Sequence, residues 1–225
     1  ETAPTPISGG ADIPDDLDNL FINPSFEGAT RTVEFGEVSV FEGWEPFYCD
    51  TPYTPDKCDA PRAGNGNPPD LKMGRPEYKS SETAGRVFSG ETAQQWFCFY
   101  RTCQAGVYQT VDTSPGATCE VTAYVQSWSS NTGGLTSDLI TYDEKINSTW
   151  FIKVALDGGT NAFSEDVLSS RGFSYWDNIY DQYALISFQF EATDALTTVF
   201  FENLRIWPVA NNDNYLDDVS IRCSE

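Results

Sequence analysis

Histidine is absent from this sequence, and basic residues are scarce. Without His no Ser-His or Cys-His nucleophile can form, and a mixed Cys/His zinc site is excluded. The 13 Lys and Arg residues stand against 34 Asp and Glu residues, which gives a net charge of −21. That charge repels phosphate backbones and anionic lipid headgroups, so we expect neither nucleic acid nor a membrane surface as a partner.

Long apolar runs are missing as well. No stretch approaches the roughly 20 apolar residues of a transmembrane helix, so we expect no membrane insertion. The sequence opens at Glu1 with neither an initiator Met nor a signal peptide. We expect this of a mature product whose targeting segment has been removed.

The six cysteines form an even set with no pair of C-x-x-C knuckles. Disulfides in an oxidising compartment are the simplest account of them, which predicts a secreted, extracellular or cell-surface protein. Spacing favours three pairs: Cys49 with Cys58, Cys98 with Cys103, and Cys119 with Cys223. The last pair would tie an internal strand to the final one.

Short segments rich in β-branched and aromatic residues, separated by turn residues, dominate the chain after residue 19. They predict an all-β fold with two antiparallel sheets, as in a β-sandwich or jelly roll. The predicted strands cover 107–112, 119–128, 149–156, 183–192, 197–207 and 214–221.

Two segments lack this pattern. Residues 1–19 are rich in Pro, Gly and Asp and predict an extended tail or linker, which we expect to dock on its own domain or on a neighbouring copy. The remainder, 20–225, is predicted as one sandwich domain with a long Pro-rich, disulfide-stapled loop at about 45–84. That loop is either a recognition loop or a cover over one sandwich edge.

Five stretches together resemble the carbohydrate-binding modules of the galactose-binding-like β-sandwich superfamily, with xylan- and cellulose-binding modules as the nearest groups. They are LFINPSFEG (20–28), GW (43–44), GVYQTVDTSPGATCEVTAYVQ (106–126), FQFEATDALTTVFFEN (188–203) and NNDNYLDDVSI (211–221). The resemblance spans about residues 20–223 and implies a jelly roll that binds glycans.

A structural Ca²⁺ is implied by the same resemblance. In that superfamily the ion typically sits where the first strand meets the last, held by a Glu of the N-x-x-F-E stretch, an Asp of the D-D-V stretch and backbone carbonyls. The matching positions here are Glu27 and Asp217 or Asp218.

The surroundings of Asp217 pose a separate question. Alternation along the last strand predicts its side chain on the same side as Val219 and Ile221, where the core lies. A buried carboxylate needs a partner. Ca²⁺ is one; an Arg such as Arg205, or turn amides, are the alternatives.

Aromatic residues make up 14% of the chain, and sugar rings stack on aromatic side chains through their C–H faces. On the predicted strand 119–128 one face carries Tyr124, Gln126 and Trp128. A second candidate patch surrounds the Cys98–Cys103 loop, with Trp96, Tyr100 and Arg101; Trp96 fits the core at least as well.

These observations favour a non-catalytic extracellular carbohydrate-binding sandwich. A carboxylate pair could still hydrolyse glycosides, but no compact Glu-x-Asp-x-x-Glu cluster is present, so we expect no enzyme. The alternative is a structural subunit of an extracellular filament or adhesive surface assembly, in which the N-terminal tail self-associates with a neighbouring copy.

Overall fold

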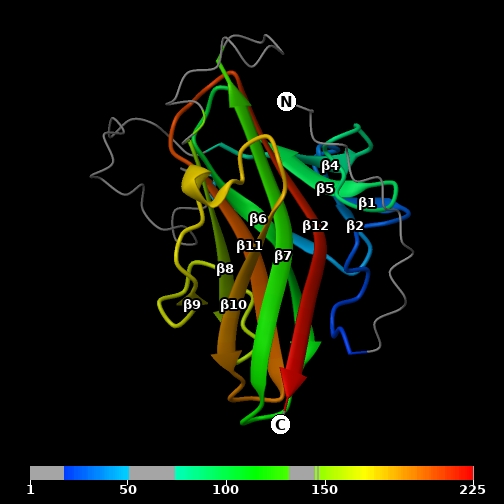
Figure 1. Cartoon of the computed structure of the whole chain (residues 1–225), viewed down its shortest axis with the longest axis vertical. Helices are drawn as coiled ribbons and strands as arrows, with labels where there is room; N and C mark the ends of the chain where they lie inside the picture. The colour runs from blue at the N-terminus through cyan, green and yellow to red at the C-terminus, as the bar shows by residue number, and fades with distance from the viewer. Residues whose placement is uncertain (1–17, 51–73, 132–144, 146, 225) are drawn as a thin grey trace, which may run out of the picture.

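Two β-sheets packed face to face form the molecule (Figure 1). The computed structural model describes residues 18–50, 74–131, 145 and 147–224. The seven-stranded sheet has the order β1-β2-β4-β5-β12-β7-β10, and the five-stranded sheet has the order β3-β6-β11-β8-β9. Neighbouring strands pair antiparallel except β2 and β4, which pair in parallel. The expected all-β sandwich is therefore confirmed.

The strands vary widely in length, and every described strand of eight or more residues lies after residue 102. In chain order the elements are β1 Thr30–Glu34, β2 Val38–Phe41, β3 Glu45–Tyr48, β4 Glu77–Ser81, β5 Ala93–Phe97, β6 Cys103–Asp112, β7 Thr118–Ser130, β8 Ser148–Ala155, β9 Leu168–Ser169, the 3-10 turn η2 Tyr175–Asp177, β10 Ala184–Glu191, β11 Leu196–Arg205 and β12 Asn211–Ser224.

Each of the six predicted strands corresponds to an observed one, from β6 to β12 with β9 left out. The prediction missed β1 to β5, which are four or five residues long and too short for a clear alternation. The predicted loop 45–84 is also wrong at both ends, because it begins with β3 and ends with β4. Its middle, residues 51–73, lies outside the described residues.

Large aromatic side chains fill the space between the sheets. Trp96 lies against Tyr78 and Trp150, with ring centroids 5.8 and 5.1 Å apart, and Trp44 packs against Phe26 at 4.9 Å. All five side chains are buried. Burying side chains of this size from water is the main favourable contribution to folding.

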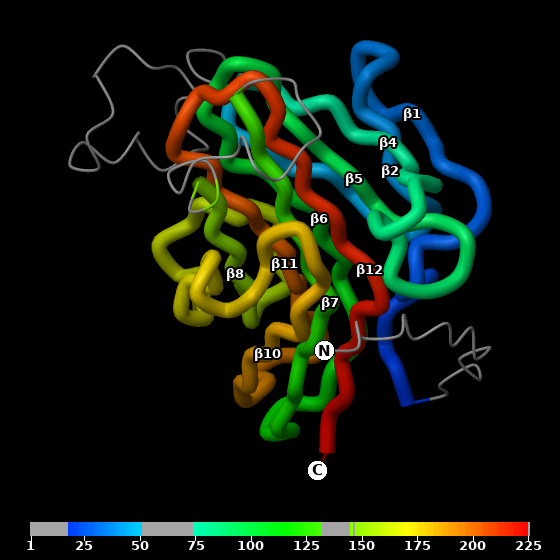
Figure 2. The backbone as a smooth tube through the Cα atoms, turned by 45° about the horizontal axis from the view of Figure 1, so that its top comes forward, coloured from blue at the N-terminus to red at the C-terminus, as the bar shows by residue number. Residues whose placement is uncertain are grey.

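Strands β7 and β12 lie side by side in the seven-stranded sheet, between β5 and the edge strand β10 (Figure 2). Their pairing runs from Asn211 opposite Ser130 to Ser224 opposite Thr118. It is interrupted once, by an irregularity between Asp217 and Ser220. Near the far end the Cys119–Cys223 disulfide joins the two strands covalently.

Two of the three predicted disulfides are present, Cys98–Cys103 and Cys119–Cys223. The third, Cys49–Cys58, lies outside the described residues because Cys58 does. The predicted tail 1–19 falls outside them as well, apart from Asp18 and Asn19. No helix in the described ranges is long and apolar enough to cross a membrane.

The two disulfides differ in how much chain they enclose, with sequence separations of 104 and 5 residues. Because the entropy lost by the unfolded chain grows with loop length, we expect Cys119→Ala/Cys223→Ala to lower the free energy of unfolding by about 5 kcal/mol. Cys98→Ala/Cys103→Ala should cost about 2 kcal/mol. Urea denaturation of the two double variants without reductant measures the difference, and equal losses would contradict the loop-length argument.

Candidate functional site

The segment between β9 and β10, residues 170–183, closes one edge of the sandwich and is anchored to both sheets. Phe173 exchanges two backbone hydrogen bonds with Trp150 of β8, at 2.8 and 2.9 Å. Further along, Ser127 of β7 donates to the Ile179 carbonyl at 2.7 Å and accepts from the Asp181 amide at 2.9 Å. The side chains of Phe173 and Ile179 are buried in the main core. This segment, here called the edge loop, is therefore held in one position.

Within the edge loop, the turn η2 is fixed by a carboxylate. Asp177 accepts a hydrogen bond from the Ser174 amide at 2.8 Å and one from the Arg171 guanidinium at 2.7 Å. The hydrogen bond from Arg171 is the main reason that the pKa of Asp177 lies below its ordinary value. Asn178 then leaves the turn in the left-handed conformation, with φ 60°, which Asn tolerates better than most residues.

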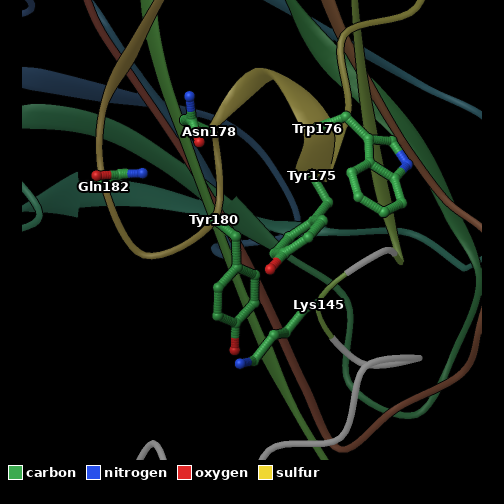
Figure 3. A pocket seen from close by; sticks show the side chains of 6 residues that line it. All are labelled: Lys145, Tyr175, Trp176, Asn178, Tyr180 and Gln182. Carbon is green, nitrogen blue, oxygen red and sulfur yellow. The ribbon is translucent and has the colours of Figure 1, made fainter.

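A pocket of about 410 Å³ opens at this edge loop (Figure 3). Five of its six described lining residues come from the loop itself, and the sixth comes from the segment before β8; they are Tyr175, Trp176, Asn178, Tyr180, Gln182 and Lys145. In Figure 3 the Tyr175 and Tyr180 rings project to the same side of the loop as the Lys145 side chain. Trp176 is 72% exposed, although large aromatic side chains are usually well buried.

The rings of the pocket form a connected group. Tyr175 lies 5.4 Å from Trp176 and 6.5 Å from Tyr180 between ring centroids. The Tyr180 hydroxyl donates to the Ser129 carbonyl of β7 at 2.9 Å, which ties this ring to the sheet. The pocket thus combines aromatic faces on a fixed backbone with two side-chain amides, Asn178 and Gln182, that can both donate and accept.

The predicted strand face with Tyr124, Gln126 and Trp128 exists, but another segment lies over it. Residues 82–92, here called the strap, cross this outer face of the seven-stranded sheet. Phe88 of the strap stacks on Tyr124 with ring centroids 3.7 Å apart, and Gln126 donates to the Gly85 carbonyl at 3.1 Å. Gln126 is buried as a result. Its prediction as a freely accessible sugar contact is therefore wrong.

Arg86 fixes the strap on Trp128. Its guanidinium lies 5.7 Å from the Trp128 ring centroid and 5.3 Å from that of Tyr215, within the range of cation–π attraction. The same group forms an ion pair with Asp181 of the edge loop at 2.8 Å. In addition, the Tyr183 hydroxyl donates to the Arg86 carbonyl at 3.0 Å. Strap and edge loop therefore support each other.

The second predicted patch, around the Cys98–Cys103 loop, divides between core and surface. Trp96 is 0% exposed and belongs to the main core, so its prediction as a sugar-binding residue is wrong. Tyr100 is 69% exposed, and Arg101 is exposed beside it. The backbone of this loop is fixed by the disulfide and by a 3.0 Å hydrogen bond from the Tyr100 amide to the Val209 carbonyl.

Asp217 is buried, but on the other side of the sheet from the one that alternation predicts. The irregularity between Asp217 and Ser220, with Asp218 at φ 41°, shifts the alternation by one residue. Val219 and Ile221 therefore face the core, whereas Asp217 lies beneath the strap.

The partners of Asp217 are backbone amides, one of the two alternatives to a metal ion considered above. Its Oδ2 accepts from the amides of Phe88 and Ser89 at 2.8 and 3.3 Å, and its Oδ1 accepts from the Asp218 amide at 2.9 Å. Arg205, the basic partner considered above, instead donates to Asn214 at 2.7 and 3.0 Å in the core.

Glu27, Asp217 and Asp218, the positions that the resemblance suggests as calcium ligands, each accept hydrogen bonds from residues of the strap. Glu27 accepts from the amides of Glu91 and Thr92 at 2.8 and 3.2 Å, and the Ser89 hydroxyl donates to Asp218 at 2.9 Å. Burial, and next the charge of Asp218, raise the pKa of Asp217 to about 8. Burial also raises the pKa of Asp218, with the charge of Glu27 adding to it.

These acids do not form a ready-made metal centre. Across residues 18–50, 74–131, 145 and 147–224, no group of three or more Cys, Asp or Glu side chains is arranged to hold an ion. The donor chemistry still fits a hard cation, since all three side chains offer only oxygen atoms.

The edge-loop pocket was missed by sequence reasoning. Its stretch, FSYWDNIYDQY (173–183), carries five aromatic residues interleaved with polar ones, but no regular alternation places it on a strand. Aromatic density in a predicted loop was the available signal. Phe173 and Ile179 anchor the edge loop in the core, and this anchoring decides which of the rings are buried and which are exposed.

Solved structures share this architecture, although no protein-family model and no curated protein sequence matches the chain. A family 61 carbohydrate-binding module in complex with β-1,4-galactotriose aligns over 92% of this chain and 99% of its own length, with a TM-score of 0.52 and 10% sequence identity. The chain has the fold of a carbohydrate-binding β-sandwich module.

Other solved structures match this chain less fully. A xylan-binding domain from family 22 aligns over 67% of it and 83% of its own length, with a TM-score of 0.41 and 14% identity. An arabinose-bound α-L-arabinofuranosidase aligns over 92% of this chain but only 26% of its own length, with a TM-score of 0.49 and 11% identity.

The turn beneath the pocket gives a pH-dependent prediction. Asp177→Asn should lower the free energy of unfolding by about 1 kcal/mol at pH 7, mostly through the weakened bond to the Ser174 amide, because the Arg171 partner is exposed. Since the folded pKa is depressed, this stability is present above the unfolded pKa of about 4 and is lost as pH falls through the folded value.

Urea denaturation at pH 7 and at about pH 3 measures the difference in the free energy of unfolding between wild type and Asp177→Asn. The control is Asp166→Asn, which changes an exposed acid in the preceding loop. A difference that does not change with pH would contradict the role of the carboxylate.

Proposed function

We propose that this protein is a non-catalytic carbohydrate-binding module that holds a saccharide in the edge-loop pocket. The observation that carries the proposal is the exposed Trp176 beside Tyr175 and Tyr180 on a backbone anchored to both sheets. Aromatic faces can stack on the C–H faces of sugar rings, while Asn178 and Gln182 can hydrogen-bond to hydroxyls. The fold shared with carbohydrate-binding modules supports it.

The anchored backbone of the edge loop makes this pocket a better binding site than a flexible loop would be. The edge loop is anchored by the backbone of Ser127 and Trp150 and by the Arg86–Asp181 ion pair. A preformed surface loses little conformational entropy on binding, so more of the contact energy becomes affinity.

The described lining of the pocket also favours binding over hydrolysis. Glycoside hydrolysis requires two carboxyl groups on either side of the scissile bond. The described residues that line the pocket are aromatic, amide and ammonium side chains, with no Asp or Glu among them.

The working location that we propose is outside the cell. The Cys98–Cys103 and Cys119–Cys223 disulfides persist in oxidising compartments, and polysaccharide partners are found there.

Trp176→Ala tests the pocket. We expect the variant to lose at least about tenfold in affinity for its polysaccharide, because an aromatic anchor at the centre of a binding site commonly contributes more than about 1.4 kcal/mol. Affinity gel electrophoresis against a panel of soluble neutral and acidic plant and microbial polysaccharides provides the measurement.

Phe35→Ala is the matched control, since Phe35 is 70% exposed between β1 and β2, far from the edge loop in the sheet order. It should bind like wild type, and both variants should melt near the wild-type temperature. Retention of no polysaccharide by the wild type would refute the proposed function; equal retention by wild type and Trp176→Ala would refute this site.

A structural Ca²⁺ between the strap and β12 is the second part of the proposal. Glu27, Asp217 and Asp218 would hold it, together with backbone carbonyls. The support is electrostatic: all three acids contact the strap, and no ion pair of the described residues gives any of them a basic partner. A bound divalent cation would offset their repulsion and fix the strap on the sheet.

EDTA should therefore lower the melting temperature of the module, and excess Ca²⁺ should restore it. Asp218→Asn should melt at a temperature that responds to neither treatment, while Asp166→Asn should respond like wild type. Differential scanning calorimetry with and without EDTA measures the shift, and a wild-type transition that EDTA leaves unchanged would rule out the calcium site.

A further inference from the structure

The edge-loop pocket contains one charged side chain among its described lining residues, and it is basic. Lys145 is that residue; its five neighbours in the lining are aromatic or amide side chains. A cation at this position is unusual in a chain with 13 basic and 34 acidic residues.

Lys145 also differs from the nearby arginines. Arg171 is paired with Asp177 and Arg86 with Asp181, so both are neutralised within the fold. Within the described part of the chain, Lys145 forms no ion pair. A lysine ammonium group offers three donors from which a ligand carboxylate can accept.

We propose that the pocket selects a saccharide that carries a carboxylate, such as a uronic acid residue, and that Lys145 binds this carboxylate. The inference rests on the proposed function of the same pocket and names its ligand class. The sugar ring stacks on the aromatic faces of Tyr175 and Trp176, while its carboxylate meets the Lys145 ammonium group, which lies beside the Tyr180 ring in Figure 3.

The overall charge of the protein limits how many negative charges the ligand can carry. At −21 the molecule repels a densely charged polyanion, because repulsion between exposed charges extends over a Debye length of about 8 Å at physiological salt. A single carboxylate in contact with Lys145 gains a short-range attraction that outweighs the more distant, screened charges. The ligand that fits is thus a mostly neutral chain with isolated uronic acid substituents.

The magnitude of the preference follows from the exposure of the site. Lys145 is half-buried, so its ion pair is partly screened by solvent. We expect the acidic saccharide to bind about three- to tenfold more tightly than its neutral counterpart, and the difference to shrink in 0.5 M NaCl.

The test compares native uronic-acid-bearing polysaccharides, glucuronoxylan and gum arabic among them, with the same polymers after chemical reduction of their carboxyl groups. Affinity electrophoresis of wild type, Lys145→Gln and the control Lys79→Gln, a cation on the face of the seven-stranded sheet, gives the affinities. Lys145→Gln should lose the preference for the native polymers and keep its affinity for the reduced ones. Lys79→Gln should behave like wild type.

Three results would overturn the inference while leaving the proposed function in place: equal wild-type affinity for native and reduced polymers, binding to neutral polysaccharides only, or an unchanged preference in Lys145→Gln. Tighter binding to a dense polyuronate such as homogalacturonan than to glucuronoxylan would also overturn it. If the wild type retains no polysaccharide, acidic or neutral, the proposed function fails and the inference fails with it.

Discussion

Strands β7 and β12 exchange backbone hydrogen bonds along almost their whole length, and several features of the molecule depend on where that ladder holds and where it breaks. Where it holds, Ser127 is fixed in the sheet and its backbone anchors the edge loop. Where it breaks, at Asp218, the last strand turns Asp217 outward beneath the strap. The Cys119–Cys223 disulfide closes the ladder near its end, so its register is fixed covalently as well.

The strap and the edge loop are two parts of one surface structure. Arg86 lies over Trp128 and Tyr215, and it reaches Asp181 in the edge loop. The aromatic side chains on the outer face of the sheet therefore hold the strap, whereas Tyr175, Trp176 and Tyr180 of the edge loop line the pocket. Residues of the same chemical type thus have different roles because of what lies over them.

The fold could be predicted from the sequence to a large extent. The long strands β6 to β8 and β10 to β12 have enough residues for alternation to be visible, and two disulfides followed from spacing alone. The resemblance implied that Glu27 and Asp217 or Asp218 share a calcium ion; in the structure each of these acids contacts the strap. Predictions for the sugar site did less well. The sequence made Gln126 and Trp96 candidates for sugar contacts. Gln126 lies beneath the strap, and Trp96 lies between the sheets.

Local pattern in the sequence determined the all-β class, the sandwich, the extreme acidity and the absence of histidine chemistry, because these depend on composition and on period-two alternation over adjacent residues. Only the tertiary structure decided which aromatic side chains are accessible, since that depends on segments distant in sequence: residues 82–92 cover Tyr124, and Trp150 and Ser127 position Trp176. The same applies to Asp217. A single-residue irregularity at Asp218 moved the Asp217 side chain to the other side of the sheet. Alternation cannot predict this shift, because the strap that binds Asp217 is distant in sequence.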